Sequence, residues 1–105
     1  MKRILVPIDG SDHSAKALRY LAERRKSGEK AEVLILNVQS GMPSSRYVSK
    51  QAIKDFQSAE SEKALGKVKV RALQRLLKAD AYAEVGEPAE VIVSFAKKSG
   101  TSEIV

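Results

Sequence analysis

Apolar positions recur along this chain in two different periods, which predicts strands and helices in alternation. Residues 4–8 form a short apolar run, rich in β-branched side chains, that stops at Asp9 and Gly10. This pattern is typical of a buried strand followed by a tight turn. The segment after the turn carries an apolar stripe at helical spacing, formed by Ala15, Leu18, Leu21 and Ala22.

The first helix and the strand after it have clear boundaries in the sequence. Ser11 or Asp12 can accept backbone N–H groups at the helix start. The helix is expected to end near Ser27, because three basic residues and then Gly28 close the pattern. Residues 31–38 are apolar with little alternation, as in a parallel strand that is covered on both faces. Two strands joined by such a helix predict a right-handed βαβ unit.

The middle of the chain predicts a loop, a long helical segment and an edge strand. Residues 39–49 are rich in serine and contain a glycine and a proline, so we expect a loop. Residues 48–78 have a helical pattern that is too long for a small sheet at about 1.5 Å per residue. We therefore expect its first half to overhang the sheet or the segment to break near Gly66. Residues 81–85 predict a strand at the edge of the sheet, because Glu84 is polar.

The last part of the chain predicts one more helix and the start of a fourth strand. Pro88 is suited to the first position of the helix. The expected buried face of this helix is Ala89, Ile92, Val93 and Ala96, with Phe95 beside it. In the preceding long segment the expected core residues are Leu65, Val68, Leu73 and Leu76. Residues 101–105 begin a strand that stops after two core-type side chains, so we expect a shortened chain whose unpaired sheet edge favours self-association.

Length and composition restrict the class of protein. With 105 residues, 43% apolar and 30% charged, the sequence predicts a single folded domain. It has no cysteine and one histidine, so disulfides, thiolate metal sites and histidine-rich metal sites are excluded. The apolar run 4–8 is too short for a signal sequence or a membrane span, and we expect a cytoplasmic protein. The net charge of +6 comes without interleaved aromatic residues, which argues against nucleic acid as a partner.

The end of the first strand is where we expect a ligand. In an open parallel sheet, ligands bind outside the carboxyl ends of the strands, usually where the strand order reverses. If residues 4–8 form a central strand, Asp9, Gly10 and Ser11 lie at that position. The sequence places no serine, cysteine or carboxylate to orient His13 as a base, so we expect a surface histidine and no catalytic residue.

Five segments, in matching order and spacing, resemble the universal stress protein family. They are Ile-Leu-Val-Pro-Ile-Asp-Gly-Ser (4–11), Ser-Ala-Lys-Ala-Leu (14–18), Val-Leu-Ile-Leu-Asn-Val (33–38), Val-Gly-Glu-Pro-Ala (85–89) and Ser-Glu-Ile-Val (102–105). The resemblance implies an α/β fold, a Rossmann-like three-layer α/β/α sandwich with a parallel sheet in the order 3-2-1-4-5, with strand 5 missing here. It also implies a homodimer and, in many members, an adenine nucleotide at the strand ends.

The resemblance also implies which residues hold the nucleotide, here ATP with or without Mg2+. In the family the turn beside the adenine and ribose matches Pro7, Asp9 and Ser11, the residue against the adenine matches Val38, and Gly86 lies near the same rim. The candidate binding residues are Pro7, Ile8, Asp9, Gly10, Ser11, Val38 and Gly86. The glycine-rich phosphate loop of nucleotide-binding members does not occur in these 105 residues, so we expect few donors for a triphosphate. Glu103 stands where the family usually has aspartate.

Several alternatives stay open at this point. The chain is either a regulatory adenine-nucleotide binder in a stress or signalling role, or a nucleotide-free module that dimerises or docks on a partner. We expect no enzyme, apart from slow ATP hydrolysis by a full-length parent. Asp9 either contacts the ligand or Mg2+, or accepts N–H groups at the helix start. Gly86 either permits close approach of a ligand or only forms a turn.

Overall fold

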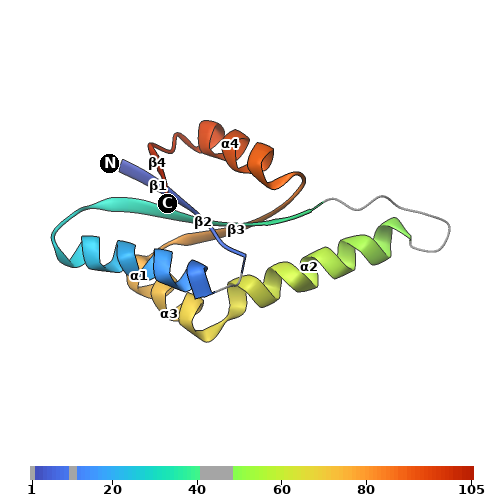
Figure 1. Ribbon diagram of the computed structural model, residues 1–105, viewed down its shortest axis with the longest axis horizontal. Helices are drawn as coiled ribbons and strands as arrows, with labels where there is room; N and C mark the ends of the chain where they lie inside the picture. Colours follow the sequence, from blue (N-terminus) through green and yellow to red (C-terminus); the bar gives the residue numbers. More distant parts are fainter. Residues whose placement is uncertain (1, 10–11, 41–48) are drawn as a thin grey trace.

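The computed structural model describes residues 2–9, 12–40 and 49–105, which form a parallel sheet between helices (Figure 1). The described elements are β1 (Lys2–Pro7), α1 (Asp12–Lys26), β2 (Ala31–Gln39), α2 (Lys50–Gly66), α3 (Val68–Leu77), β3 (Asp80–Val85), α4 (Pro88–Ser99) and β4 (Glu103–Ile104). The strand order is β3-β2-β1-β4, and all neighbouring strands are parallel. Helices α1 and α3 cover one face and α4 covers the other (Figure 1). The predicted Rossmann-like three-layer α/β/α fold is confirmed.

The core lies on both faces of the central strands, because alternate residues of a strand point to opposite faces. The cluster on the α1 and α3 face includes Ile4, Val6, Ile8, Leu18, Leu21, Val33, Ile35, Val70 and Leu77. The smaller cluster on the α4 face consists of Leu5, Leu34 and Leu36, with Ile92, Phe95 and Ala96 packed against it. The register pairs Ile4 with Val33 of β2 and with Glu103 of β4. β1 is therefore an inner strand, as predicted.

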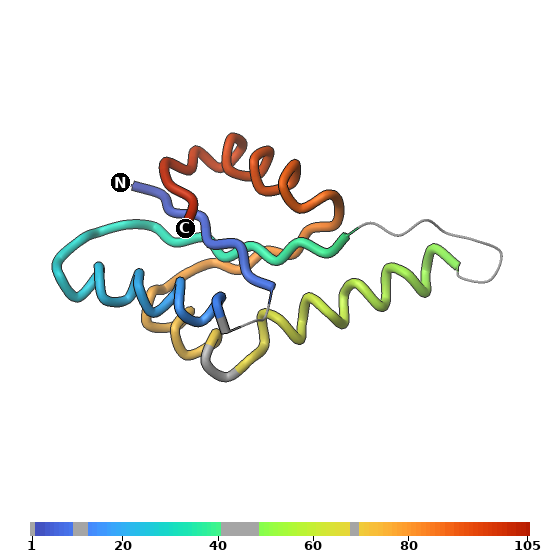
Figure 2. The backbone as a smooth tube through the Cα atoms, in the orientation of Figure 1, coloured from blue at the N-terminus to red at the C-terminus, as the bar shows by residue number. Residues whose placement is uncertain are grey.

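The long helical segment breaks where the sequence predicts a break. α2 ends at Gly66, α3 begins at Val68, and Lys67 between them has an extended backbone conformation. The first half of α2 extends beyond the sheet (Figures 1 and 2), because this helix of 17 residues is longer than the strands beside it. Most of the loop predicted at 39–49 lies outside the described residues.

Several apolar side chains do not lie where the sequence places them. Val93 is 48% exposed and Ala89 is also exposed, so their prediction as buried residues is wrong. The face of α4 that contacts the sheet is instead the one that carries Ile92, Phe95 and Ala96. Apolar residues lie on more than one side of this short helix, so periodicity alone did not identify the face that is buried.

The same error occurs in the long segment. Leu76 is 54% exposed, so its assignment to the core is wrong, while Leu65 and Leu73 are partly buried against the core. The side chain of Val68 lies outside the described part of the structure. In α3 the residue that enters the core is Leu77, the neighbour of Leu76. None of the described helices is both long and apolar enough to cross a membrane.

Candidate functional site

An open groove lies at the carboxyl ends of β1 and β2, next to the point where the strand order reverses between β1 and β4. Its volume is about 560 Å³, within the range of small-molecule sites. The residues that line it are Pro7, Ile8, Asp9, His13, Ser14, Ala17, Leu36, Val38, Pro88 and Val105. We call it the carboxyl-edge groove. Parallel α/β sheets bind ligands at this position.

The structure brings some of the candidate residues together at this groove. Those that line it are Pro7, Ile8, Asp9 and Val38. Gly86 lies at the same end of the sheet, where its N–H donates to the carbonyl oxygen of Gln39 at 2.9 Å, but it does not line the groove. Gly10 and Ser11 lie outside the described residues. The binding role of all seven stays a prediction.

Gly86 has a steric role in the turn that leads into α4. Its φ is 154°, and a Cβ at this position would lie 2.7 Å from Cγ2 of Val91. A side chain at residue 86 would therefore strain the backbone and displace the first turn of α4. The sequence left two interpretations of Gly86, close approach of a ligand or a turn. The turn alone is enough to explain why glycine occupies this position.

Asp9 is held by Ser14, a residue that the sequence analysis did not single out. The hydroxyl of Ser14 donates to Oδ1 of Asp9 at 2.9 Å and accepts the N–H of Asp9 at 3.1 Å. Ser14 is buried, whereas Asp9 is exposed at the groove. This reciprocal contact fixes the orientation of the carboxylate. A serine in the first turn of the helix, five residues after a strand-end aspartate, is the signal in the sequence.

Asn37 forms a buried hydrogen-bond network beneath the groove. It is fully buried, and its Nδ2 donates to the carbonyl oxygen of Ile8 at 2.6 Å. Its Oδ1 accepts from Oγ of Ser61 at 2.7 Å and from Nε2 of Gln39 at 3.1 Å. One amide thus connects the end of β1 to β2 and to α2. The signal for this network is the single polar residue within the apolar run 33–38.

The groove combines apolar walls with a few polar groups. Pro7, Ile8 and Val38 supply apolar surface at the strand ends, and Asp9 and His13 supply a carboxylate and an imidazole. The first turn of α1 faces the groove, and its backbone N–H groups favour anions. Among the described residues, no three histidine, cysteine, aspartate or glutamate side chains are grouped so that they could hold a metal ion.

Comparison with known proteins identifies the family. The sequence profile described as "Universal stress protein family" matches residues 1–105. The chain belongs to the universal stress protein family. Universal stress protein YxiE of Bacillus subtilis (strain 168) is 34% identical over 113 aligned positions, which cover 98% of this chain and 76% of that protein.

Solved structures of other universal stress proteins share the fold. One was solved in complex with cAMP and superimposes with a TM-score of 0.65 at 17% identity, covering 98% of this chain and 73% of that one. A family member from Arabidopsis thaliana, solved with AMP bound, has a TM-score of 0.66 at 17% identity, covering 99% of this chain and 74% of that one. At these identities the superpositions establish the fold.

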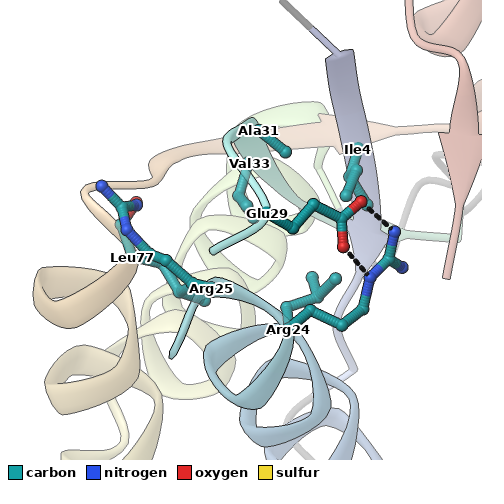
Figure 3. Close-up of a pocket in the computed structure, with 8 residues that line it drawn as sticks. Ile4, Arg24, Arg25, Glu29, Ala31, Val33 and Leu77 are labelled. Atoms are coloured by element: carbon teal, nitrogen blue, oxygen red, sulfur yellow. Dashed lines mark hydrogen bonds and ion pairs between the residues drawn. The ribbon is translucent and has the colours of Figure 1, made fainter. Parts of the chain in front are cut away.

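A second and much smaller cavity of this universal stress protein lies near the C-terminal end of α1 (Figure 3). Its volume of about 10 Å³ leaves space for no more than one water molecule. Arg24, at its rim, pairs with both carboxylate oxygens of Glu29 (Figure 3) and with Glu103 at 2.6 Å. Lys2 pairs with the same two glutamates, at 3.5 and 2.7 Å. We call Lys2, Arg24, Glu29 and Glu103 the Arg24 cluster, and its role is structural.

The Arg24 cluster predicts a specific acid dependence of stability. Hydrogen bonds from Arg24 and Lys2 lower the pKa of Glu103 from 4.5 to about 2, and Arg24 also lowers the pKa of Glu29. A carboxyl group whose pKa is lower in the folded state than in the unfolded state stabilises the fold at a pH above the unfolded-state pKa. This stabilisation is lost as the pH falls through the folded-state pKa. We expect the melting temperature to fall between pH 4.5 and pH 2. Circular dichroism melts over this range measure it.

Replacement Glu103→Gln tests which carboxylate is responsible. The variant lacks the ion pairs at every pH, so we expect it to melt lower than the wild type at neutral pH and to lose less on acidification. Glu32→Gln is the control, because in the described part of the chain Glu32 forms a single exposed ion pair, with Arg3. A gap between wild type and Glu103→Gln that stays constant from pH 5 to pH 2 would contradict the assignment.

Proposed function

We propose that this universal stress protein binds an adenine nucleotide in the carboxyl-edge groove and acts by regulation rather than catalysis. The observation that carries the proposal is the juxtaposition of apolar strand ends and one oriented carboxylate. Val38 and Pro7 offer surface to the flat faces of a purine, and Asp9 offers an acceptor for its exocyclic amino group. Ser14 holds that acceptor in place.

The proposal includes ATP, with or without Mg2+, as the nucleotide. The first turn of α1 faces the groove and can receive a phosphate through its N–H groups. Two proteins of the same fold were solved with AMP and with cAMP, which supports an adenine nucleotide of some kind. A titration series of AMP, cAMP and ATP with Mg2+ separates the three.

The proposal further includes a cytoplasmic homodimer without enzymatic activity. His13 is the single histidine of the chain, and no carboxylate of the described residues is hydrogen-bonded to it, so none of these orients it as a general base. Ile104, on the outermost strand β4, is 49% exposed, which supports association through an apolar sheet edge. The absence of cysteine is compatible with a reducing compartment.

Replacement of Asp9 tests the proposed site. We expect Asp9→Ala to weaken AMP binding about tenfold, or 1.4 kcal/mol, because the base loses its acceptor. Isothermal titration calorimetry of the 105-residue chain measures the affinity, and a thermal melt shows whether the variant is folded. Asp55→Ala is the matched control, because Asp55 lies exposed on α2 and, within the described residues, its carboxylate accepts a hydrogen bond from Gln51. Absence of heat up to millimolar AMP, cAMP and ATP would reject nucleotide binding and favour the nucleotide-free module.

A further inference from the structure

The edge of β3 is the most open backbone of the described sheet. β3 pairs with β2 on one side and has no described neighbour on the other. All six of its residues are exposed, including Tyr82 at 40% and Val85 at 52%. No residue of β3 lines the carboxyl-edge groove, although Glu84 pairs in register with Val38, which does.

The backbone groups that face outward follow from the ladder with β2. The N–H of Gly86 donates to the carbonyl oxygen of Gln39, so residue 86 faces β2. In a strand the N–H and C=O of one residue point to one side and those of the next residue point to the other. Counting back from Gly86, the outward groups belong to Ala81, Ala83 and Val85. Three N–H and three C=O groups are thus available to an added strand.

A hollow lies on each face of this edge. On the α4 face, a hollow of about 350 Å³ is lined by Glu84, Glu90, Phe95 and Lys98 among others. On the α2 and α3 face, a hollow of about 370 Å³ has the small side chains of Ala81 and Ala83 on its floor. The side chains of an added strand alternate between the two faces. The hollows therefore lie where alternate side chains of such a strand would point.

The charge of this region is opposite to that of the whole chain. The chain carries +6, yet the charged residues of β3 are both acidic, Asp80 and Glu84. Glu90 and Glu62 add one carboxylate to each hollow, against Lys98 and Arg71. None of these four carboxylates forms an ion pair with another described residue. Four unpaired carboxylates favour a basic partner.

A second copy of the chain meets like charges when it pairs with this edge about Tyr82. Consider two copies whose β3 strands pair antiparallel, with Tyr82 of one copy opposite Tyr82 of the other and the α4 faces of both sheets on the same side. In this pair Asp80 of each copy lies opposite Glu84 of the other. Like charges directly across a strand pair are destabilising. We therefore propose that the β3 edge binds an extended segment of another protein that carries basic side chains at alternate positions.

The proposal is tested with a defined peptide. The probe is a fluorescein-labelled decapeptide in which lysine alternates with valine, and the matched control peptide has glutamate in place of lysine. Fluorescence anisotropy is measured with the 105-residue chain. We expect the lysine peptide to bind at least about tenfold more tightly than the glutamate peptide. Equal affinities, or no binding of the lysine peptide up to millimolar protein, would overturn the proposal.

Two variants separate strand addition from simple charge attraction. Ala83→Pro removes an outward N–H without breaking the ladder to β2. We expect this variant to bind the lysine peptide at least about tenfold more weakly than the wild type does. Glu84→Lys keeps every backbone group, and we expect it to reverse the preference between the peptides. Unchanged binding of the lysine peptide to Ala83→Pro, or an unchanged preference between the peptides in Glu84→Lys, would overturn the proposal. A dimer in sedimentation that Ala83→Pro dissociates would also overturn it, because a second copy would then occupy the edge.

Discussion

Val38→Trp is expected to weaken AMP binding by about 30-fold or more, which corresponds to 2 kcal/mol. Val38 is half-buried at the end of β2 and lines the carboxyl-edge groove. An indole at this position fills the space that we assign to the purine. Because Val38 also packs against the cluster of Leu5, Leu34 and Leu36, a thermal melt checks that the variant is folded. Isothermal titration calorimetry with AMP measures the loss.

The chain offers a matched control for this substitution. Val93 is 48% exposed on the outer side of α4 and does not line the groove. Val93→Trp therefore introduces the same side chain at a distance from the site, and we expect AMP affinity within about twofold of the wild type. Full AMP affinity in a folded Val38→Trp variant would place the nucleotide elsewhere and contradict the proposed site.

Asn37→Ala is expected to lower the free energy of unfolding by about 2–3 kcal/mol. The substitution leaves the carbonyl oxygen of Ile8 and the hydroxyl of Ser61 without their partner in a buried position. It also leaves a small void beneath the groove, which adds to the cost. Urea unfolding followed by circular dichroism measures the change.

A double-mutant cycle shows whether the effect comes from the network. Ser61→Ala alone removes one hydrogen bond, and we expect it to cost about 1 kcal/mol. Because Asn37 and Ser61 contact each other, the double variant should lose less than the sum of the two single losses. Strict additivity would show that the hydrogen bond between Asn37 and Ser61 does not carry the effect.

Most of the fold follows from the sequence because the central strands are short apolar runs, whereas the apolar residues of the first helix recur at helical spacing. The run 4–8 is fully apolar, Glu32 and Asn37 are the only polar residues of 31–38, and the stripe of α1 lies on one side of the helix. Both element type and buried face were therefore predicted correctly. α4 and α3 have apolar residues on several sides. There the choice between Val93 and Phe95, or between Leu76 and Leu77, depends on the sheet that the helix meets.

The candidate site could be predicted only in part, for a related reason. Strand-end chemistry and family resemblance indicate Pro7, Asp9 and Val38, which lie at the positions that the topology dictates. Ser14 and Asn37 act on the groove through hydrogen bonds to other residues. Such contacts depend on which elements lie side by side in space, and the distance along the chain gives little indication of them.

The short strand β4 has a consequence for the order in which the sheet assembles. Ser102 and Arg3 are hydrogen-bonded although 99 residues separate them, and β4 adds only two register pairs. β1, β2 and β3 follow one another along the chain, so their pairing closes much shorter loops, and loop closure costs more entropy as the loop lengthens. We expect β4 to join after the other three strands have paired. Since Val105 lines the carboxyl-edge groove, the groove gains its last wall only in the final step of folding.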